Sequence, residues 1–214
     1  MNLPNKLSLL RICLVPLFVV AYFLPYAWGA YVAVALFIIA AATDFLDGYI
    51  ARKYNMVTDL GKLLDPIADK ILVCAALFCV VATNPMQYLS YLRLQWATTF
   101  GVILLAVGAT VILARELLVS AVRQIAATKG VVVQANFYGK IKTIFQDVSL
   151  PMIVVLNGLS IQAANSTAPL EYNSSLFWII WWWVAVALFV LAVVLTIVSG
   201  AIYLKQNRKV FSSK

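Results

Sequence analysis

The chain has 214 residues, of which 64% are hydrophobic and 11% are charged. Soluble domains have roughly 45–50% apolar and about 25% charged residues, so this composition excludes an ordinary soluble domain. The formal net charge is +8, and the chain contains no histidine. The lack of histidine excludes Ser-His-Asp and Cys-His nucleophilic sites and His-ligated zinc.

Six apolar segments are candidate transmembrane helices, since a spanning helix needs about 20 mostly apolar residues. In chain order they are 8–25, 30–50, 64–83, 97–120, 139–161 and 177–204. No polar linker and no internal repeat separates them. We therefore expect an all-α membrane protein whose residues 1–214 form a single transmembrane domain.

The basic residues predict the orientation of these spans. With six spans both termini lie on one side of the membrane, and of the 16 lysines and arginines only Arg93 falls on the other side. An excess of Lys and Arg marks cytoplasmic loops, so we expect both termini in the cytoplasm. Nucleic-acid binding is not expected, because the basic residues border membrane spans and no recognition motif accompanies them.

Four of the eight acidic residues are clustered in the sequence: Asp44, Asp47, Asp65 and Asp69. The first pair is three residues apart near the end of the second segment, and the second pair is four residues apart at the start of the third. Both spacings place a pair on one face of a helix. The connection at about 53–61 is short, so the two helices should be antiparallel neighbours with the pairs facing each other.

The cost of these carboxylates points to a bound cation. One aspartate at the centre of a membrane costs about 2.5–3.5 kcal/mol, so four would cost on the order of 10 kcal/mol. That approaches the whole stability of a typical domain, about 5–15 kcal/mol. Carboxylates without His or Cys are hard oxygen ligands that suit Mg²⁺ or Mn²⁺. The alternative is that they pair with nearby bases (Arg52, Lys53, Lys62 and Lys70) at the membrane interface.

Small residues accompany the aspartates. Gly48 and Ala51 share the helix face of the first pair, and Gly61 lies one turn before Asp65. Small side chains here would let a ligand approach the backbone closely, although they also favour helix–helix packing. Arg52 lies four residues after Gly48 and could hold a phosphate.

Together these residues form one continuous pattern, D-x-x-D-G-x-x-A-R, eight residues, then G-x-x-x-D-x-x-x-D, over 44–69. This pattern resembles the signature of the CDP-alcohol phosphatidyltransferase family without departure. The resemblance implies six transmembrane helices after a short amphipathic N-terminal segment, usually in a homodimer. It also implies roles for the motif residues: a pair of Mg²⁺ or Mn²⁺ ions on Asp44, Asp47, Asp65 and Asp69, Asp69 as the general base, and the CDP group on Gly48, Ala51, Arg52 and Gly61.

Three further segments are similar to one branch of this family, whose members make phosphatidylglycerol phosphate. They are the opening Asn2–Arg11, the stretch Arg115–Arg123 and the stretch Gly139–Thr143. This similarity implies that a phosphatidyl group moves from CDP-diacylglycerol to glycerol 3-phosphate in phospholipid biosynthesis. It also implies a bacterial inner membrane, with the active site facing the cytoplasm.

A second basic patch bears on the acceptor. Arg115, Arg123, Lys140 and Lys142 lie at the predicted cytoplasmic ends of the fourth and fifth spans, with only Glu116 and Asp147 to offset them. We expect Arg115, Arg123 and Lys140 to bind the phosphate of the acceptor. Lys142 is two residues from Lys140 and so should point elsewhere on a helix. The alternative is that the patch only anchors the topology.

Two other functions are compatible with these patterns. A relative in the same family could use serine, inositol, inositol phosphate or phosphatidylglycerol as its acceptor. A divalent-metal transporter could use the acidic cluster as an ion pathway. The transporter predicts acids along several spans across the membrane, whereas the acids here gather in the predicted cytoplasmic half.

Overall fold

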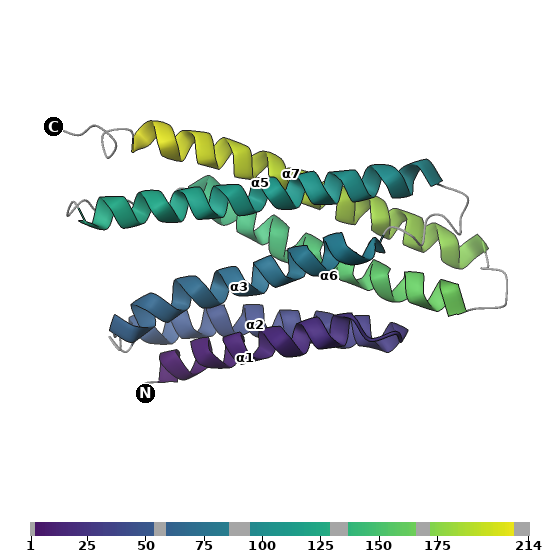
Figure 1. Ribbon diagram of the computed structural model, residues 1–214, viewed down its shortest axis with the longest axis horizontal. Coiled ribbons are helices and arrows are strands. Elements are labelled where there is room, and N and C mark those ends of the chain that lie inside the picture. The colour runs from purple at the N-terminus through teal and green to yellow at the C-terminus, as the bar shows by residue number, and fades with distance from the viewer. Residues whose placement is uncertain (1–2, 54–58, 86–94, 129–136, 166–171, 208–214) are drawn as a thin grey trace.

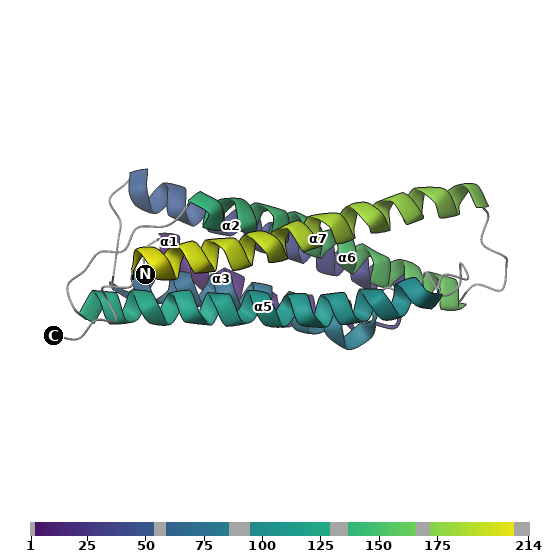
Figure 2. The same cartoon turned by 90° about the horizontal axis from the view of Figure 1, so that it is seen from above.

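The computed structural model describes residues 3–53, 59–85, 95–128, 137–165 and 172–207. These residues form an elongated bundle whose helices run roughly along one common axis (Figures 1 and 2). The helices are α1 (Leu3–Tyr22), α2 (Ala27–Lys53), α3 (Asp59–Thr83), α5 (Gln95–Thr128), α6 (Phe137–Asn165) and α7 (Tyr172–Gln206). The all-α prediction is confirmed for the described residues.

Four helices are long and apolar enough to cross a membrane, which makes the chain an integral membrane protein. Their candidate spans are Asn5–Tyr22, Thr98–Ala126, Phe137–Asn165 and Leu176–Gln206. Among the described side chains, the apolar parts of α2 and α3 are shorter, Ala27–Thr43 and Lys70–Thr83. Of the six predicted spans, four are confirmed by length and composition.

The first helix differs from its prediction. The expected span 8–25 followed a separate N-terminal segment, but one continuous helix runs from Leu3 to Tyr22. Asn5, Ser8 and Arg11 are buried on this helix, and their three-residue spacing places them on one face. Because the bundle accommodates this polar face, no break separates the opening residues from the apolar turns. The helix ends before Pro25, in agreement with the restriction that proline places on preceding residues.

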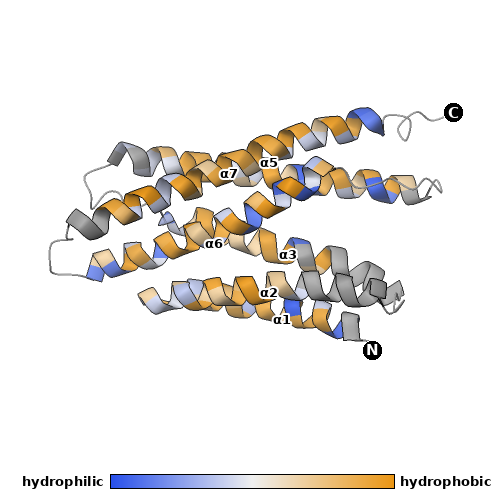
Figure 3. Ribbon diagram, turned by 180° about the vertical axis from the view of Figure 1, so that it is seen from behind, coloured by the Kyte–Doolittle hydropathy of each residue, from blue (hydrophilic) through white to orange (hydrophobic). Residues whose placement is uncertain are grey.

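Every helix contributes to the main apolar core. Phe18, Phe37, Leu77, Ile112, Ile153 and Phe189 come from the six helices in chain order, and each is at most 1% exposed. Other large apolar side chains face outward, such as Phe78 and Leu117. Hydrophobic residues dominate the helices along most of their length (Figure 3). An apolar exterior of this kind matches the hydrocarbon of a bilayer.

One end of the bundle collects the chemically important segments, and we call it the motif end. The helices alternate in direction, so α1, α3 and α6 begin there and α2, α5 and α7 finish there (Figure 1, left). The motif aspartates on α2 and α3 therefore share an end with the basic residues of α5 and α6. Their convergence supports a site assembled from several helices.

Polar contacts hold the opposite end of the bundle together. The hydroxyls of Tyr22 and Thr83 lie 2.6 Å apart and link α1 to α3. Ser160 on α6 donates to the carbonyl oxygen of Pro85 at 3.2 Å, and Asn157 donates to that of Tyr22 at 3.5 Å. These hydrogen bonds fix the relative depth of α1, α3 and α6 far from the motif.

A glycine allows α5 and α7 to pack closely. A Cβ placed at Gly108 would lie 2.4 Å from a ring carbon of Phe189, and that ring is fully buried. Small residues at such contacts are typical of helix pairs in membranes. The approach of α5 to α7 also determines where Arg115, two turns further along α5, meets α7.

We predict that Gly108→Ala destabilises the protein. Overpacking a core usually costs about 1–3 kcal/mol, which outweighs the gain of about 1 kcal/mol in helix propensity from alanine. Thermal unfolding in detergent micelles should show a lower midpoint. Val107→Leu is the matched control, because it also adds one carbon but at an exposed neighbouring position. A midpoint unchanged or raised in Gly108→Ala would show that Phe189 moves aside at little cost.

Candidate active site

The motif residues occupy the facing ends of two neighbouring helices. Asp44, Asp47, Gly48, Ala51 and Arg52 lie in the last turns of α2, and Gly61, Asp65 and Asp69 lie in the first turns of α3. The two helices contact each other, and the helical period places each aspartate pair on one face. The side chains of these motif residues lie outside the described part of the structure, so their ligand roles stay predictions.

The described neighbours of Asp69 connect the motif to the rest of the bundle. Ala68 is fully buried, and Lys70 donates a hydrogen bond from its Nζ to the hydroxyl of Ser120 on α5. Ser120 in turn donates to the carbonyl oxygen of Glu116 at 2.6 Å. The start of α3 is thereby tied to the charged turn of α5.

A cavity of about 290 Å³ lies between α3, α5 and α6. Its wall is polar where Lys70, Glu116, Lys142 and Gln146 meet and apolar elsewhere. Pockets that combine an apolar wall with a few convergent polar groups are typical ligand sites. The lining residues are Lys70, Val73, Cys74, Phe78, Leu113, Glu116, Leu117, Lys142, Thr143 and Gln146.

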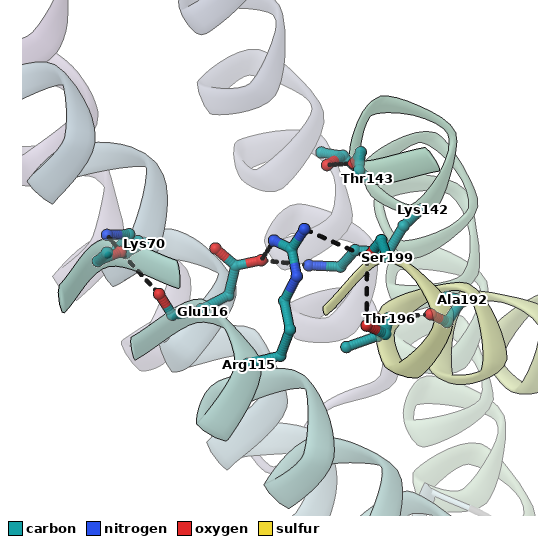
Figure 4. Close-up of polar contacts among 10 residues, drawn as sticks. Lys70, Arg115, Glu116, Lys142, Thr143, Ala192, Thr196 and Ser199 are labelled. Carbon is teal, nitrogen blue, oxygen red and sulfur yellow. Dashed lines mark hydrogen bonds and ion pairs between the residues drawn. The ribbon is translucent and has the colours of Figure 1, made fainter. Parts of the chain in front are cut away.

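The Glu116 carboxylate is the centre of a charged network (Figure 4). Its Oε1 pairs with the Nη1 atom of Arg115 at 3.1 Å and with the Nζ atom of Lys142. Lys142 is 2% exposed, and a buried ammonium is tolerated only with a partner of this kind. Arg115 also donates from Nη2 to the Ser199 hydroxyl on α7 at 3.2 Å. One carboxylate thus joins α5 to α6, and Arg115 extends the connection to α7.

Two glycines make room for the Arg115 side chain. A Cβ at Gly139 on α6 would lie 3.2 Å from the Nη2 atom of Arg115, and a Cβ at Gly200 on α7 would lie 3.2 Å from its Cγ. The guanidinium therefore passes between α6 and α7 with little free space. This packing gives Arg115 a fixed position at the motif end.

The other predicted acceptor-binding residues are more exposed. Arg123 is exposed, and its guanidinium lies 6.0 Å from the centroid of the Tyr203 ring. Lys140 is exposed at the start of α6. Neither residue lines the cavity between α3, α5 and α6, whereas Arg115 contacts the Glu116 network. Their role in binding the acceptor stays a prediction.

Two residues that line the cavity, Lys142 and Gln146, were not assigned to the site from the sequence. Both are 2% exposed, and they continue the buried face of α6 that includes Ser149 and Ile153. The spacing of these positions follows the helical period. Extending the apolar face of the fifth span toward its N-terminus would have identified them, and would have favoured Lys142 over Lys140 for the interior.

The structure also draws attention to the polar face of α1. Asn5, Ser8 and Arg11 are at most 4% exposed, and none of the three lacks a partner. A fully buried arginine needs compensating groups. The resemblance of Asn2–Arg11 to one family branch had marked this segment without indicating that its side chains face the interior.

No group of three or more His, Cys, Asp or Glu side chains could hold a metal ion among those that the structure describes. The side chains of the four motif aspartates are not among them, so this observation does not test the predicted metal site. Their chemistry suits a divalent ion, since they would supply only hard oxygen donors.

The chain is similar over nearly its whole length to known proteins. The family model for CDP-alcohol phosphatidyltransferase matches residues 1–198. Three similar proteins carry the name CDP-diacylglycerol–glycerol-3-phosphate 3-phosphatidyltransferase. The one from Bacillus subtilis is 38% identical, with 96% of this chain and 95% of the relative covered. Those from Salmonella paratyphi A and Rickettsia felis are 34% and 31% identical over 97% and 98% of this chain, and 95% and 97% of the relatives are covered.

These matches extend over nearly the whole chain, include the complete aspartate motif, and accompany an all-helical membrane fold that brings the motif and the basic residues to one end. This chain belongs to the CDP-alcohol phosphatidyltransferase family.

Proposed function

We propose that this protein transfers a phosphatidyl group from CDP-diacylglycerol to glycerol 3-phosphate, giving phosphatidylglycerol phosphate and CMP. The observation that carries the proposal is the full-length similarity to relatives named for this reaction. Family membership argues against the divalent-metal transporter. CMP release by the purified protein, measured with CDP-diacylglycerol and glycerol 3-phosphate, serine, inositol or inositol phosphate, tests the proposal directly.

The charge of the described residues supports an anionic acceptor. Lys70 and Lys142 line the cavity, and Arg115 shares the Glu116 carboxylate with Lys142. Three cations against one carboxylate leave a positive surplus, which suits a phosphate. We assign the acceptor phosphate to Arg115, Arg123 and Lys140, as the sequence suggests, and add Lys142 because it lines the cavity.

The reaction follows from the proposed residue roles. The primary hydroxyl oxygen of the acceptor attacks the phosphorus bonded to diacylglycerol, and the bond from that phosphorus to the CMP oxygen breaks. Asp69 accepts the hydroxyl proton, since a carboxylate within reach is a suitable base. Gly48, Ala51 and Gly61 allow the CDP group to approach the helices, and Arg52 holds its phosphate.

We further propose that Asp44, Asp47, Asp65 and Asp69 hold Mg²⁺ or Mn²⁺, as a pair of ions. The fit is supported by an all-oxygen donor set on contacting helices. When bound, such ions neutralise the diphosphate and stabilise the leaving phosphate.

The proposed membrane arrangement has six spans. Helices α2 and α3 contain 27 and 25 residues, so at about 1.5 Å per residue both exceed the roughly 30 Å of a bilayer core. Residues 1–214 then form one transmembrane domain with both termini and the motif end in the cytoplasm of a bacterium, at its inner membrane. The family resemblance favours a homodimer.

Activity should depend on a divalent metal. Chelation with excess EDTA is expected to abolish CMP release, and Mg²⁺ or Mn²⁺ should restore it, because uncompensated carboxylates repel a diphosphate. Adding the EDTA already saturated with Mg²⁺ is the control for effects of the chelator itself. Full activity in excess EDTA would contradict the proposed metal site.

Asp69→Asn should lose turnover while still binding the CDP-lipid. The substitution removes the base but keeps the size of the side chain, and a missing general base lowers the rate by roughly 10²–10⁴. Asp44→Asn and Asp65→Asn should in addition weaken binding of metal and nucleotide. Asp59→Asn is the matched control, since Asp59 begins α3 outside the motif. Near-normal kcat in Asp69→Asn would remove Asp69 from this role.

Removing a phosphate-binding cation should raise the KM for glycerol 3-phosphate. A charge-assisted hydrogen bond contributes roughly 1.5–3 kcal/mol, which corresponds to about a ten- to a hundredfold change. Arg115→Ala, Lys140→Ala and Lys142→Met should each show it, with little change in the KM for CDP-diacylglycerol. Lys205→Ala, an exposed residue near the end of α7, controls for loss of charge alone. An unchanged KM would exclude the altered residue from the phosphate site.

A further inference from the structure

Arg11 places a positive charge inside the bundle. Its side chain is fully buried, it lies within the candidate span Asn5–Tyr22, and it has an interaction partner. A buried charge is tolerated where an opposite charge and hydrogen bonds compensate it. An acid on a helix that packs against α1 would supply both.

The packing of α1 limits which acid this can be. The helix packs mainly against α2 and α3, whereas Asp147 belongs to α6 and Glu116 on α5 is engaged with two other cations. The acids on α2 and α3 are Asp44, Asp47, Asp59, Asp65 and Asp69. All of these except Asp59, the first residue of α3, belong to the aspartate motif. We therefore expect the countercharge of Arg11 to come from the motif.

A contact between two aromatic rings shows how α1 and α2 align. The ring centroids of Phe18 and Phe37 are 6.1 Å apart, and the two helices are antiparallel neighbours (Figure 1). Arg11 lies seven residues before Phe18, and Asp44 lies seven residues after Phe37. Both steps lead about two turns toward the motif end. Because each helix rises about 1.5 Å per residue, Arg11 and Asp44 lie at about the same depth in the bundle.

The helical period also places the two residues on facing surfaces. Positions seven apart on a helix share a face. Arg11 is buried on the face of α1 that carries Phe18, and the buried face of α2 that includes Phe37 and Ala40 continues to position 44. Side chains lean toward the start of their own helix, so the long side chain of Arg11 extends toward the motif end.

We propose that Arg11 is a positioning residue that pairs with the Asp44 carboxylate and orients it for the divalent ions. This inference rests on the proposed metal site, which is part of the proposed function. A carboxylate has two oxygens with about four acceptor sites, so Asp44 can accept from a guanidinium and still bind a metal. Groups that hydrogen-bond to a metal ligand fix its orientation. The pair also offsets one of the four motif carboxylates before metal binds.

A double-mutant cycle in metal-free protein tests the pairing. With EDTA present, Arg11→Met should lower the midpoint of thermal unfolding in micelles by roughly 10 °C, the shift expected when a buried ion pair loses one partner. In the Asp44→Asn background the same substitution should lower the midpoint little or raise it, because Arg11 then has no charge to offset. Equal effects of Arg11→Met in the two backgrounds would overturn the pairing.

Two further variants complete the cycle. Asp147→Asn removes an acid of α6 and is the matched control, so Arg11→Met should keep its full effect in that background. If Arg11→Met alone does not fold, the double variant Arg11→Met/Asp44→Asn should recover folded protein, because it leaves neither charge unpaired. Failure of that recovery would overturn the pairing.

Binding of Mn²⁺ in the absence of substrate, followed by electron paramagnetic resonance, tests the positioning role. Loss of a group that orients a metal ligand typically weakens metal binding 10- to 100-fold, so Arg11→Met should raise the Kd for Mn²⁺ by about that factor. Lys6→Met removes a cation from an exposed position of the same helix and should keep the wild-type Kd. A wild-type Kd in folded Arg11→Met would overturn the positioning role.

The outcomes separate this inference from the proposed function. A wild-type protein that binds no Mn²⁺ would overturn the proposed metal site and the positioning role together. A wild-type protein that binds Mn²⁺ and releases CMP only with metal, but shows no coupling between Arg11 and Asp44, would overturn the role of Arg11 alone.

Discussion

The pairing of Glu116 with two cations determines how the motif end of this bundle is built. Lys142 is almost fully buried, and the Arg115 guanidinium passes between α6 and α7. Leaving one such buried charge without its partner typically costs about 3–5 kcal/mol. A single carboxylate on α5 offsets both cations, and through them it fixes the positions of α6 and α7. Lys142 also lines the cavity.

The apolar parts of the fold support this charged network by close packing. Gly139 and Gly200 leave the space that Arg115 occupies, and Gly108 allows α5 to approach α7 two turns away. In a membrane the helices gain little from burying apolar surface, since lipid is equally apolar, so packing and hydrogen bonds determine their arrangement. The polar contacts at the opposite end, around Tyr22 and Thr83, act with the Glu116 network to set the helix depths.

The position of the cavity gives these interactions a chemical meaning. It lies between α3, α5 and α6, and α3 also carries Asp65 and Asp69 in its first turns. Lys70 follows Asp69 directly in the sequence and contacts Ser120, so the basic region and the aspartate motif are joined through adjacent residues. An acceptor held at the cavity and a lipid held at the motif would meet at one end of the bundle. Such positioning is the main contribution that proteins make to phosphoryl transfer.

The sequence by itself determined the features that depend on local pattern. Hydropathy indicated the apolar helices, and the spacing from Asp44 to Asp69 indicated the family, because both are properties of one segment or of two joined by a short connection. Glu116 and Lys142 are 26 residues apart and Arg115 and Ser199 are 84 apart, so their contacts follow from which helix faces pack together. Only the tertiary structure could place Lys142 inside and Lys140 outside, because a side chain's partners depend on helices that are distant in the sequence.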